Sequence, residues 1–312
     1  MWLRVLLLVW LLVLGASHAG PEARATPDIR NPPVAKIKPK KRVTTTTRVR
    51  STTTLPPTRS ISVPTGSLTE ASGCAITRND PNTVWLHNDS GNDPELFALD
   101  LRTGTVRSVR VANATLTDWE DMAPLPTGGV LIGDIGDNNR SRRNVTFYRV
   151  ADLAQDPVVA EAQTLIFEDG PHDAEALLVD PDPSLRPAAV YVITKEATGR
   201  AAVYQSDGDV LRKVAALTLS GEVLIFPNQI TGADALPDGS GIIVRTYQFA
   251  YLFRRPKGQP FAAAFNASPL RISVPFLPQS EAVCVVPDGR TAITTTESRG
   301  SATIAFVFFA IP

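Results

Sequence analysis

Asp118-Trp-Glu-Asp-Met-Ala-Pro124 and Asp173-Ala-Glu-Ala-Leu-Leu-Val179 share one layout: an acidic residue, a spacer, a glutamate, and then mainly small or apolar residues. Three more segments follow it: Glu70-Ala-Ser-Gly-Cys-Ala-Ile76, Gln229-Ile-Thr-Gly-Ala-Asp-Ala235 and Gln279-Ser-Glu-Ala-Val-Cys-Val285. Their second polar positions, Ser72, Glu120, Glu175, Thr231 and Glu281, recur at intervals of 48 to 56 residues. Such a period indicates a fold built from repeated units.

Each repeat continues in the same way. A turn sequence such as Pro237-Asp-Gly239 or Pro287-Asp-Gly289 follows the opening segment, and short β-rich runs come after it. No run has a helical period of useful length, so the pattern predicts an all-β fold. Four strands in each unit of about 50 residues are typical of a β-propeller blade. We expect five blades, and six if residues 217–226 contain further strands.

The last repeat ends before a fourth strand. Ile61-Ser-Val-Pro64 stands before the first repeat as Ile272-Ser-Val-Pro275 stands before the fifth. We therefore expect the N-terminal strand to complete the last blade and close the ring, which removes exposed sheet edges. Cys74 and Cys284 lie in the first and fifth repeats, which are neighbours in a closed ring. A disulfide between them is one expectation, and two buried free thiols are the alternative.

The N-terminus predicts a secreted protein. Residues 1–19 combine Arg4, an apolar run from Val5 to Leu14 and small residues before Gly20, as in a signal peptide. An uncleaved membrane anchor is the alternative, although the run is shorter than the roughly 20 residues that span a bilayer. Residues 20–60 are rich in Pro, Thr, Lys and Arg, which predicts a disordered linker, either a spacer or a cell-wall tether. Residues 61–312 are the propeller domain, expected to be monomeric and without a transmembrane helix.

Charge differs sharply between the linker and the domain. From residue 61 onward the chain has 20 basic and 29 acidic residues, whereas the linker is strongly basic. An acidic domain argues against nucleic-acid binding, which requires a basic face. The same charge is compatible with a cation site.

The polar residues of the repeats should meet at one face of the ring. In a propeller the start of the first strand and the end of the second strand of each blade lie on the same side. We therefore expect a ligand-binding funnel, mostly acidic, lined by Glu70, Asp118, Glu120, Asp173, Glu175, Lys195 and Glu281. Crowded carboxylates repel one another, so they take up protons or are neutralised by a cation.

Oxygen ligands of this kind suit Ca²⁺, or Mg²⁺, rather than zinc. The segment Asp134-Ile-Gly-Asp-Asn138 brings several oxygen atoms close together around Gly136. Asp89, Asp134, Asp137 and Asn138 are therefore the candidate metal ligands. The alternative is that Asp and Asn at blade turns cap backbone groups.

Whether the site is catalytic stays open at this stage. Glu120, Glu175, His172 and Lys195 are the candidates, with His172 a possible general acid or base beside Asp173. The sequence has no recognisable Ser-His-Asp arrangement and no Gly-x-Ser-x-Gly elbow. It also lacks a Gly-rich phosphate loop ahead of a helix, which disfavours a nucleotide enzyme.

The first repeat, with Val84-Trp-Leu-His-Asn-Asp-Ser-Gly91 and Leu96-Phe-Ala-Leu-Asp100, resembles the first blade of secreted bacterial propellers of the phytase-like esterase and SdiA-regulated families. The likeness extends to Asp118-Trp-Glu-Asp121 and Asp173-Ala-Glu-Ala176 and covers most of residues 60–312. In phytase-like propellers, calcium held by acidic residues bridges to substrate phosphate. The resemblance implies Glu120, Glu175 and Asp134 as ligands. The chain departs from that pattern in its few basic residues, chiefly Lys195 and Arg140.

Three functions follow as hypotheses. The leading one is a secreted or wall-associated propeller that binds a small-molecule, polymer or protein ligand at its acidic funnel, with a divalent cation. The second is a metal-dependent hydrolase of phosphoesters or lactones at the same place. The third is a scaffold that recognises another protein by its rim.

Overall fold

The computed structural model describes residues 57–312 except 186, 197–198, 220–227, 276 and 299. The predicted signal peptide and most of the predicted linker lie outside these residues, as does most of the stretch 217–226. β1 (Pro57–Pro64) begins within the last residues of the predicted linker. In the part of the chain that is described, no helix has the length and apolar character needed to cross a membrane.

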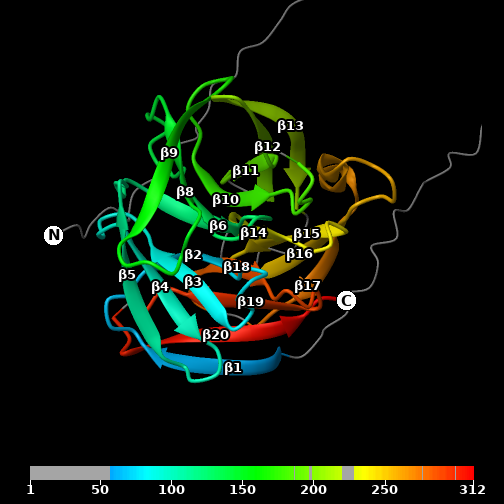
Figure 1. Cartoon of the computed structure of the whole chain (residues 1–312). Coiled ribbons are helices and arrows are strands. Elements are labelled where there is room, and N and C mark those ends of the chain that lie inside the picture. Colours follow the sequence, from blue (N-terminus) through cyan, green and yellow to red (C-terminus); the bar gives the residue numbers. More distant parts are fainter. Residues whose placement is uncertain (1–56, 186, 197–198, 220–227, 276, 299) are drawn as a thin grey trace, which may run out of the picture. The chain divides into compact units, whose positions relative to one another are not determined.

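The described chain is nearly all β and falls into five four-stranded antiparallel units (Figure 1). Unit 1 contains β2 (Ala71–Ala75), β3 (Thr83–Asn88), β4 (Glu95–Asp100) and β5 (Val106–Ala112). Unit 2 contains β6 (Trp119–Pro124), β7 (Val130–Asp134), β8 (Val145–Val150) and β9 (Val158–Phe167). Unit 3 contains β10 (Ala174–Val179), β11 (Val190–Thr194), β12 (Arg200–Asp207) and β13 (Val210–Thr218).

Unit 4 contains β14 (Ile230–Ala235), β15 (Gly241–Thr246), β16 (Phe249–Arg254) and β17 (Leu270–Ser273). A short 3₁₀ helix, η2 (Phe261–Asn266), precedes β17 and was not predicted. Unit 5 contains β18 (Ser280–Val285), β19 (Thr291–Thr296) and β20 (Thr303–Ala310). Its fourth strand is β1, which pairs with β20 in the register Ile61↔Phe306. The predicted pairing of the N-terminal strand with the last unit is therefore confirmed.

The turns between the first two strands of a unit follow from their sequence. Gly239 and Gly289, which end the two Pro-Asp-Gly turns, both have φ of +68°, a conformation that glycine adopts without steric cost. Their N–H groups donate to the carbonyls of Leu236 and Val286. The glycines therefore fix the reversal that returns each second strand along the first.

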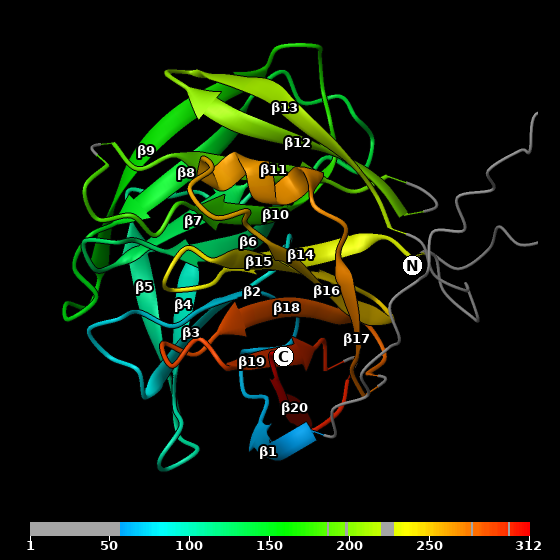
Figure 2. The same ribbon diagram turned by 90° about the vertical axis from the view of Figure 1, so that its right-hand side faces the viewer.

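The first strand of every unit lies at the centre of the described fold (Figures 1 and 2). Every residue of β2, β10, β14 and β18 is buried, because each of these strands has neighbours on both faces. β2 contacts β6, β6 contacts β10, β10 contacts β14, β14 contacts β18, and β18 contacts β2. The first strands therefore follow one another in a circle.

Hydrophobic packing follows the same circle. Five clusters of buried side chains are found among the described residues, and each lies between two consecutive units. The cluster between units 5 and 1 includes Leu86, Cys74, Cys284 and Phe306. Hydrogen-bonded pairing does not run around the circle; instead the long outer strand β9 pairs in parallel with β5 and with β13. Side-chain packing between the sheets, together with single hydrogen bonds such as that from the Ser298 N–H to the Thr69 carbonyl, joins the first unit to the last.

Candidate functional site

The starts of the first strands and the ends of the second strands lie on the same side of each unit. Ala71 pairs with Asn88, Trp119 with Asp134, and Ala174 with Thr194. This register brings the residues that precede each first strand next to the residues that follow each second strand. The acidic residues of units 1 to 3 meet at this end.

Asp134 supports the backbone at this end. Its two carboxylate oxygens accept hydrogen bonds from the N–H groups of Thr117 (3.1 Å) and Asp118 (3.2 Å). Arg142 forms an ion pair with the same carboxylate at 2.6 Å. Asn88 holds the backbone in the same way in unit 1, where its Oδ1 accepts hydrogen bonds from the N–H groups of Thr69 and Glu70. Backbone donors and an arginine thus engage both oxygens of Asp134, and its role as a metal ligand stays a prediction.

Asp137, which lies with Asn138 in the loop after β7, adjoins Asp173, another of the carboxylates at this end. Asp137 accepts a hydrogen bond from the N–H of Arg142 at 2.7 Å, and its own N–H donates to Asp173 at 3.0 Å. Asn138 is exposed. These contacts shape the loop after β7, and the ligand roles of Asp137 and Asn138 stay predictions. Of the four ligands expected from the sequence, Asp89 alone joins the group of converging carboxylates.

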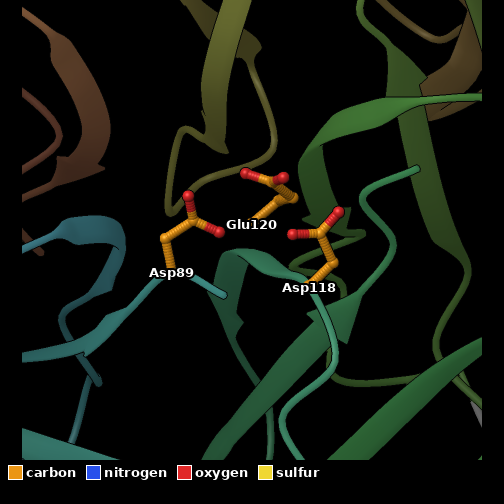
Figure 3. Close-up of side chains that lie close together, drawn as sticks. All are labelled: Asp89, Asp118 and Glu120. Atoms are coloured by element: carbon orange, nitrogen blue, oxygen red, sulfur yellow. The ribbon is translucent and has the colours of Figure 1, made fainter. Parts of the chain in front are cut away.

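Five carboxylates converge at this end, and we call Asp89, Asp118, Glu120, Asp173 and Glu175 the acidic cluster. One oxygen each of Asp89, Asp118 and Glu120 lie within 4.8 Å of one another, and so do those of Glu120, Asp173 and Glu175. Figure 3 shows Asp89, Asp118 and Glu120 pointing toward one another. Glu120 belongs to both triads and therefore links units 1, 2 and 3. Asp89 and Asp118 are partly exposed, and the other three are buried.

Glycine at position 136 leaves room for this arrangement. A Cβ atom there would collide with Glu120 Oε1 and would lie 2.5 Å from Asp118 Oδ2. Real Cβ atoms do not approach other atoms this closely, so any side chain at position 136 would displace the two carboxylates. Ser72 holds Glu120 from the opposite strand, donating to its backbone carbonyl at 2.8 Å and lying 3.3 Å from its Oε2.

Lys195 supplies positive charge to the cluster. Its Nζ donates to Glu175 Oε1 at 2.6 Å, and it lies over the ring of Tyr247, 5.8 Å from the centroid. Burial disfavours the lysine charge, but Glu175 outweighs it, so the pKa of Lys195 lies above its ordinary value. The contact joins β10 to the residue that follows β11, within unit 3.

The carboxyl groups repel one another in a poorly solvated place. Burial, followed by the charge of Asp89, raises the pKa of Asp118 to about 6. Burial raises the pKa of Glu175 to about 7 although Lys195 opposes it. Burial and then Glu175 raise the pKa of Glu120 well above its usual value. Burial and mutual repulsion thus favour the protonated forms of these carboxyl groups even beside Lys195.

Glu281 and Glu70, the remaining acidic residues expected here, have different surroundings. Glu281 is buried, and its Oε2 has no hydrogen-bond partner among the described residues. Burial and then Glu175 raise its pKa to about 8. Glu70 is exposed and accepts a hydrogen bond from Asn92 at 2.7 Å. Glu281 therefore faces the charge of the cluster, whereas Glu70 lies at its edge.

His172, a candidate catalytic residue, belongs to a separate polar group. Its Nε2 lies 2.9 Å from Asp169 and 2.8 Å from the hydroxyl of Tyr204. Tyr204 donates to Asp169 at 2.9 Å, and Phe167 packs edge-on against the imidazole. Glu196 lies 3.9 Å from the other ring nitrogen. These contacts hold His172 beside the loop before β10.

Below the cluster, two buried aspartates fill the centre. Asp121 accepts hydrogen bonds from the N–H groups of Leu177 (3.0 Å) and Ala233 (3.1 Å), and Asp234 accepts from that of Val285 (2.7 Å). At the other end Arg78 donates to the carbonyls of Pro181 and Pro237, beside a cavity of only about 30 Å³. Sequence reasoning missed Asp121 and Asp234, although a carboxylate inside an otherwise apolar strand was a usable signal.

A larger cavity of about 460 Å³ lies elsewhere, between units 2 and 3. Leu125, Leu131, Phe147, Val179 and Val190 line it, with Arg149 and Glu161 among its polar residues. None of the acidic-cluster residues belongs to its lining. The cavity and the cluster are therefore different places on the fold.

No family model matches the chain, and no curated protein does. Solved structures do match it. A luciferin-regenerating enzyme matches at 10% identity and a TM-score of 0.46, covering 81% of this chain and 96% of its own. A gluconolactonase from Xanthomonas campestris matches at 10% identity and a TM-score of 0.45, covering 77% of this chain and 86% of its own. U3-55K matches at 11% identity and a TM-score of 0.44, covering 81% of this chain and 99% of its own. Likeness at this level carries no argument about activity.

Proposed function

We propose that this chain is a secreted five-bladed β-propeller whose acidic cluster binds a divalent cation, Ca²⁺ or Mg²⁺, and through it an oxygen-bearing ligand. The observation that carries the proposal is the position of Glu120, which shares two triads of carboxylate oxygens lying within 4.8 Å of one another. Calcium–oxygen distances are about 2.3–2.6 Å, so two oxygens on one ion lie at most about 5 Å apart. The spacing within each triad therefore suits one ion.

Electrostatics support the same proposal. Asp118, Glu120, Glu175 and Glu281 all have raised pKa values, chiefly because they are buried and face one another. A divalent cation would stabilise their charged forms and supply the missing positive charge. The unpartnered Oε2 of Glu281 adds an oxygen with no other use among the described residues.

The ligand would complete the coordination shell. Calcium takes six to eight oxygens, which is more than a triad supplies when each of its carboxylates gives one oxygen. Asp89 and Asp118 are partly exposed, so water or a ligand can reach the open positions from their side. The ligand class favoured by this arrangement is a small molecule that offers carboxylate, phosphate or hydroxyl oxygens.

Calorimetric titration of the protein with CaCl₂ and MgCl₂ tests the proposal. We expect saturable binding that weakens by at least about tenfold in Glu120→Gln, because loss of a mere supporting partner already costs 10–100-fold at metal sites. Asp93→Asn is the matched control, since Asp93 is an exposed acidic residue on the loop after β3. Absence of binding, or equal affinity in Glu120→Gln, would reject the cation site.

The second candidate is metal-dependent hydrolysis of a phosphoester or lactone at the same cluster. Lys195 favours it, because an ammonium group fixed 2.6 Å from Glu175 offers a positive charge to a developing oxyanion. A panel of chromogenic phosphoesters and lactones, assayed with and without Ca²⁺, separates the candidates. Turnover that disappears in Glu120→Gln supports hydrolysis, whereas cation binding without turnover supports the binding role.

A further inference from the structure

The two cysteines of the chain meet where the circle of units closes. Cys74 lies on β2 of unit 1 and Cys284 on β18 of unit 5, and these two strands are in contact. Both side chains belong to the hydrophobic cluster that joins unit 5 to unit 1. They stand near opposite ends of the described sequence, so their contact depends on closure.

The two thiols also lie close enough to interact. Cys74 and Cys284 are 1% and 0% exposed, and burial together with the neighbouring Cys284 raises the pKa of Cys74. Both are free thiols in this structure, so the disulfide expected from the sequence is not formed in it. The sequence contains no third cysteine, so neither thiol has another intramolecular partner. A disulfide requires Cα atoms within about 7 Å, and the contact between β2 and β18 places the two cysteines on neighbouring strands.

We propose that Cys74 and Cys284 form a cross-linking site at which oxidation joins the first unit to the last by a disulfide. The oxidant is a disulfide compound such as oxidised glutathione. One protein thiolate attacks it to give a mixed disulfide and one reduced thiol. The second protein thiol then displaces the other reduced thiol, so that one S–S bond is broken, one is formed, and two protons move to the released thiols.

The disulfide would add a covalent bond to the non-covalent contacts that hold unit 5 against unit 1. Units 5 and 1 are otherwise held by apolar packing and by hydrogen bonds, such as those from the Ser298 N–H to the Thr69 carbonyl (2.8 Å) and from Arg59 to the Leu101 carbonyl (2.9 Å). A bond between residues so far apart in sequence restricts the unfolded chain strongly, which stabilises the folded state. Because both thiols are buried, the exchange has to occur during folding or during transient opening of this interface.

The test is refolding of the denatured protein in a glutathione buffer, compared with refolding in a reducing buffer. We expect two titratable thiols in the reduced sample and none in the oxidised one, with a peptide containing Cys74 linked to one containing Cys284. The melting temperature of the oxidised sample should be higher by about 10 °C. Dithiothreitol should abolish that rise.

The double variant Cys74→Ala/Cys284→Ala is the control, because it keeps the site apolar and cannot be oxidised. Its melting temperature should be equal in the two buffers. The proposal is overturned if both thiols of the wild type stay titratable, if each carries a separate glutathione, or if the cross-linked protein melts no higher than the reduced one. The outcome is independent of cation binding at the acidic cluster.

Discussion

Asp121 on β6 accepts a hydrogen bond at 3.1 Å from the N–H of Ala233 on β14, although these strands belong to units 2 and 4, which are not consecutive. The same oxygen accepts from Leu177 in unit 3. One buried carboxylate thus ties three first strands together directly below the acidic cluster. These strands close the inner side of the acidic cluster, and a ligand would approach it from the exposed side of Asp89 and Asp118.

Replacing Asp121 by alanine should therefore destabilise the fold strongly. The N–H groups of Leu177 and Ala233 would be left unpaired in the interior, at a cost of about 1–3 kcal/mol each. We expect the free energy of unfolding to fall by about 3 kcal/mol or more in urea titrations. Asp93→Ala, which removes an exposed carboxylate, should change it by less than about 0.5 kcal/mol. Similar values for both variants would contradict the role given to Asp121.

Lys195→Met should make stability depend on the cation. It leaves the buried Glu175 without its 2.6 Å partner, and breaking a buried ion pair costs about 3 kcal/mol. Thermal melts at pH 8 should show the variant well below the wild type in a chelating buffer, and saturating Ca²⁺ should recover most of the difference. A loss that calcium does not reduce would place the ion away from Glu175.

The cation-free protein should lose stability as the pH rises from 6.5 to about 8. Burial raises the pKa of Glu281 from 4.5 to about 8 and that of Asp234 from 3.8 to about 7, so the folded state holds more protons than the unfolded one in this range. Burial lowers the pKa of His87 from 6.5 to about 4, which has the opposite effect, but only below pH 6.5.

Urea titrations across this pH range check the prediction. Glu281→Gln should show a shallower fall than the wild type, because the amide does not titrate. Stability that is constant or increases with pH would show that these carboxyl groups are already ionised without the cation.

Gly136→Ala should weaken cation binding by a steric effect, because the added methyl group would displace two carboxylates of the acidic cluster. The backbone at position 136 is not in the left-handed region, and the atoms nearest to the added methyl group would be those of the Glu120 and Asp118 carboxylates. We expect calcium affinity to drop at least about tenfold in calorimetry, comparable with loss of a supporting partner at a metal site. Gly133→Ala is the matched control, since its methyl group would meet Ile135 at 3.2 Å instead. Equal affinities of the two variants would count against the ligand roles of Glu120 and Asp118.

Much of the fold was predictable because similar segments recur along the sequence at a regular interval. Turns such as Pro237-Asp-Gly239 and the matching Ile61-Ser-Val-Pro64 and Ile272-Ser-Val-Pro275 placed the strands and the pairing of β1 with β20. The parallel pairing of β9 with β5 and β13 was not predictable, because it depends on how far an outer strand extends beyond its own sheet. η2 was missed because six residues carry too little periodicity.

The location of the site was predictable from the sequence, but the role of each of its acidic residues was not. Repeat alignment placed Asp118, Glu120, Asp173 and Glu175 at one end, and the structure brings them together. Composition alone could not separate them from Asp134, whose neighbours Thr117, Asp118 and Arg142 engage its oxygens. Whether an aspartate holds a backbone or stays available for an ion depends on local geometry that the residue type does not reveal.

The most direct test of the central claim is anomalous scattering from crystals grown with calcium. The account predicts one strong peak within about 2.6 Å of oxygens from Glu120 and at least two other members of the acidic cluster. A well-ordered cluster with no peak at saturating calcium, or a peak bound only by Asp134 and Asp137, would contradict it.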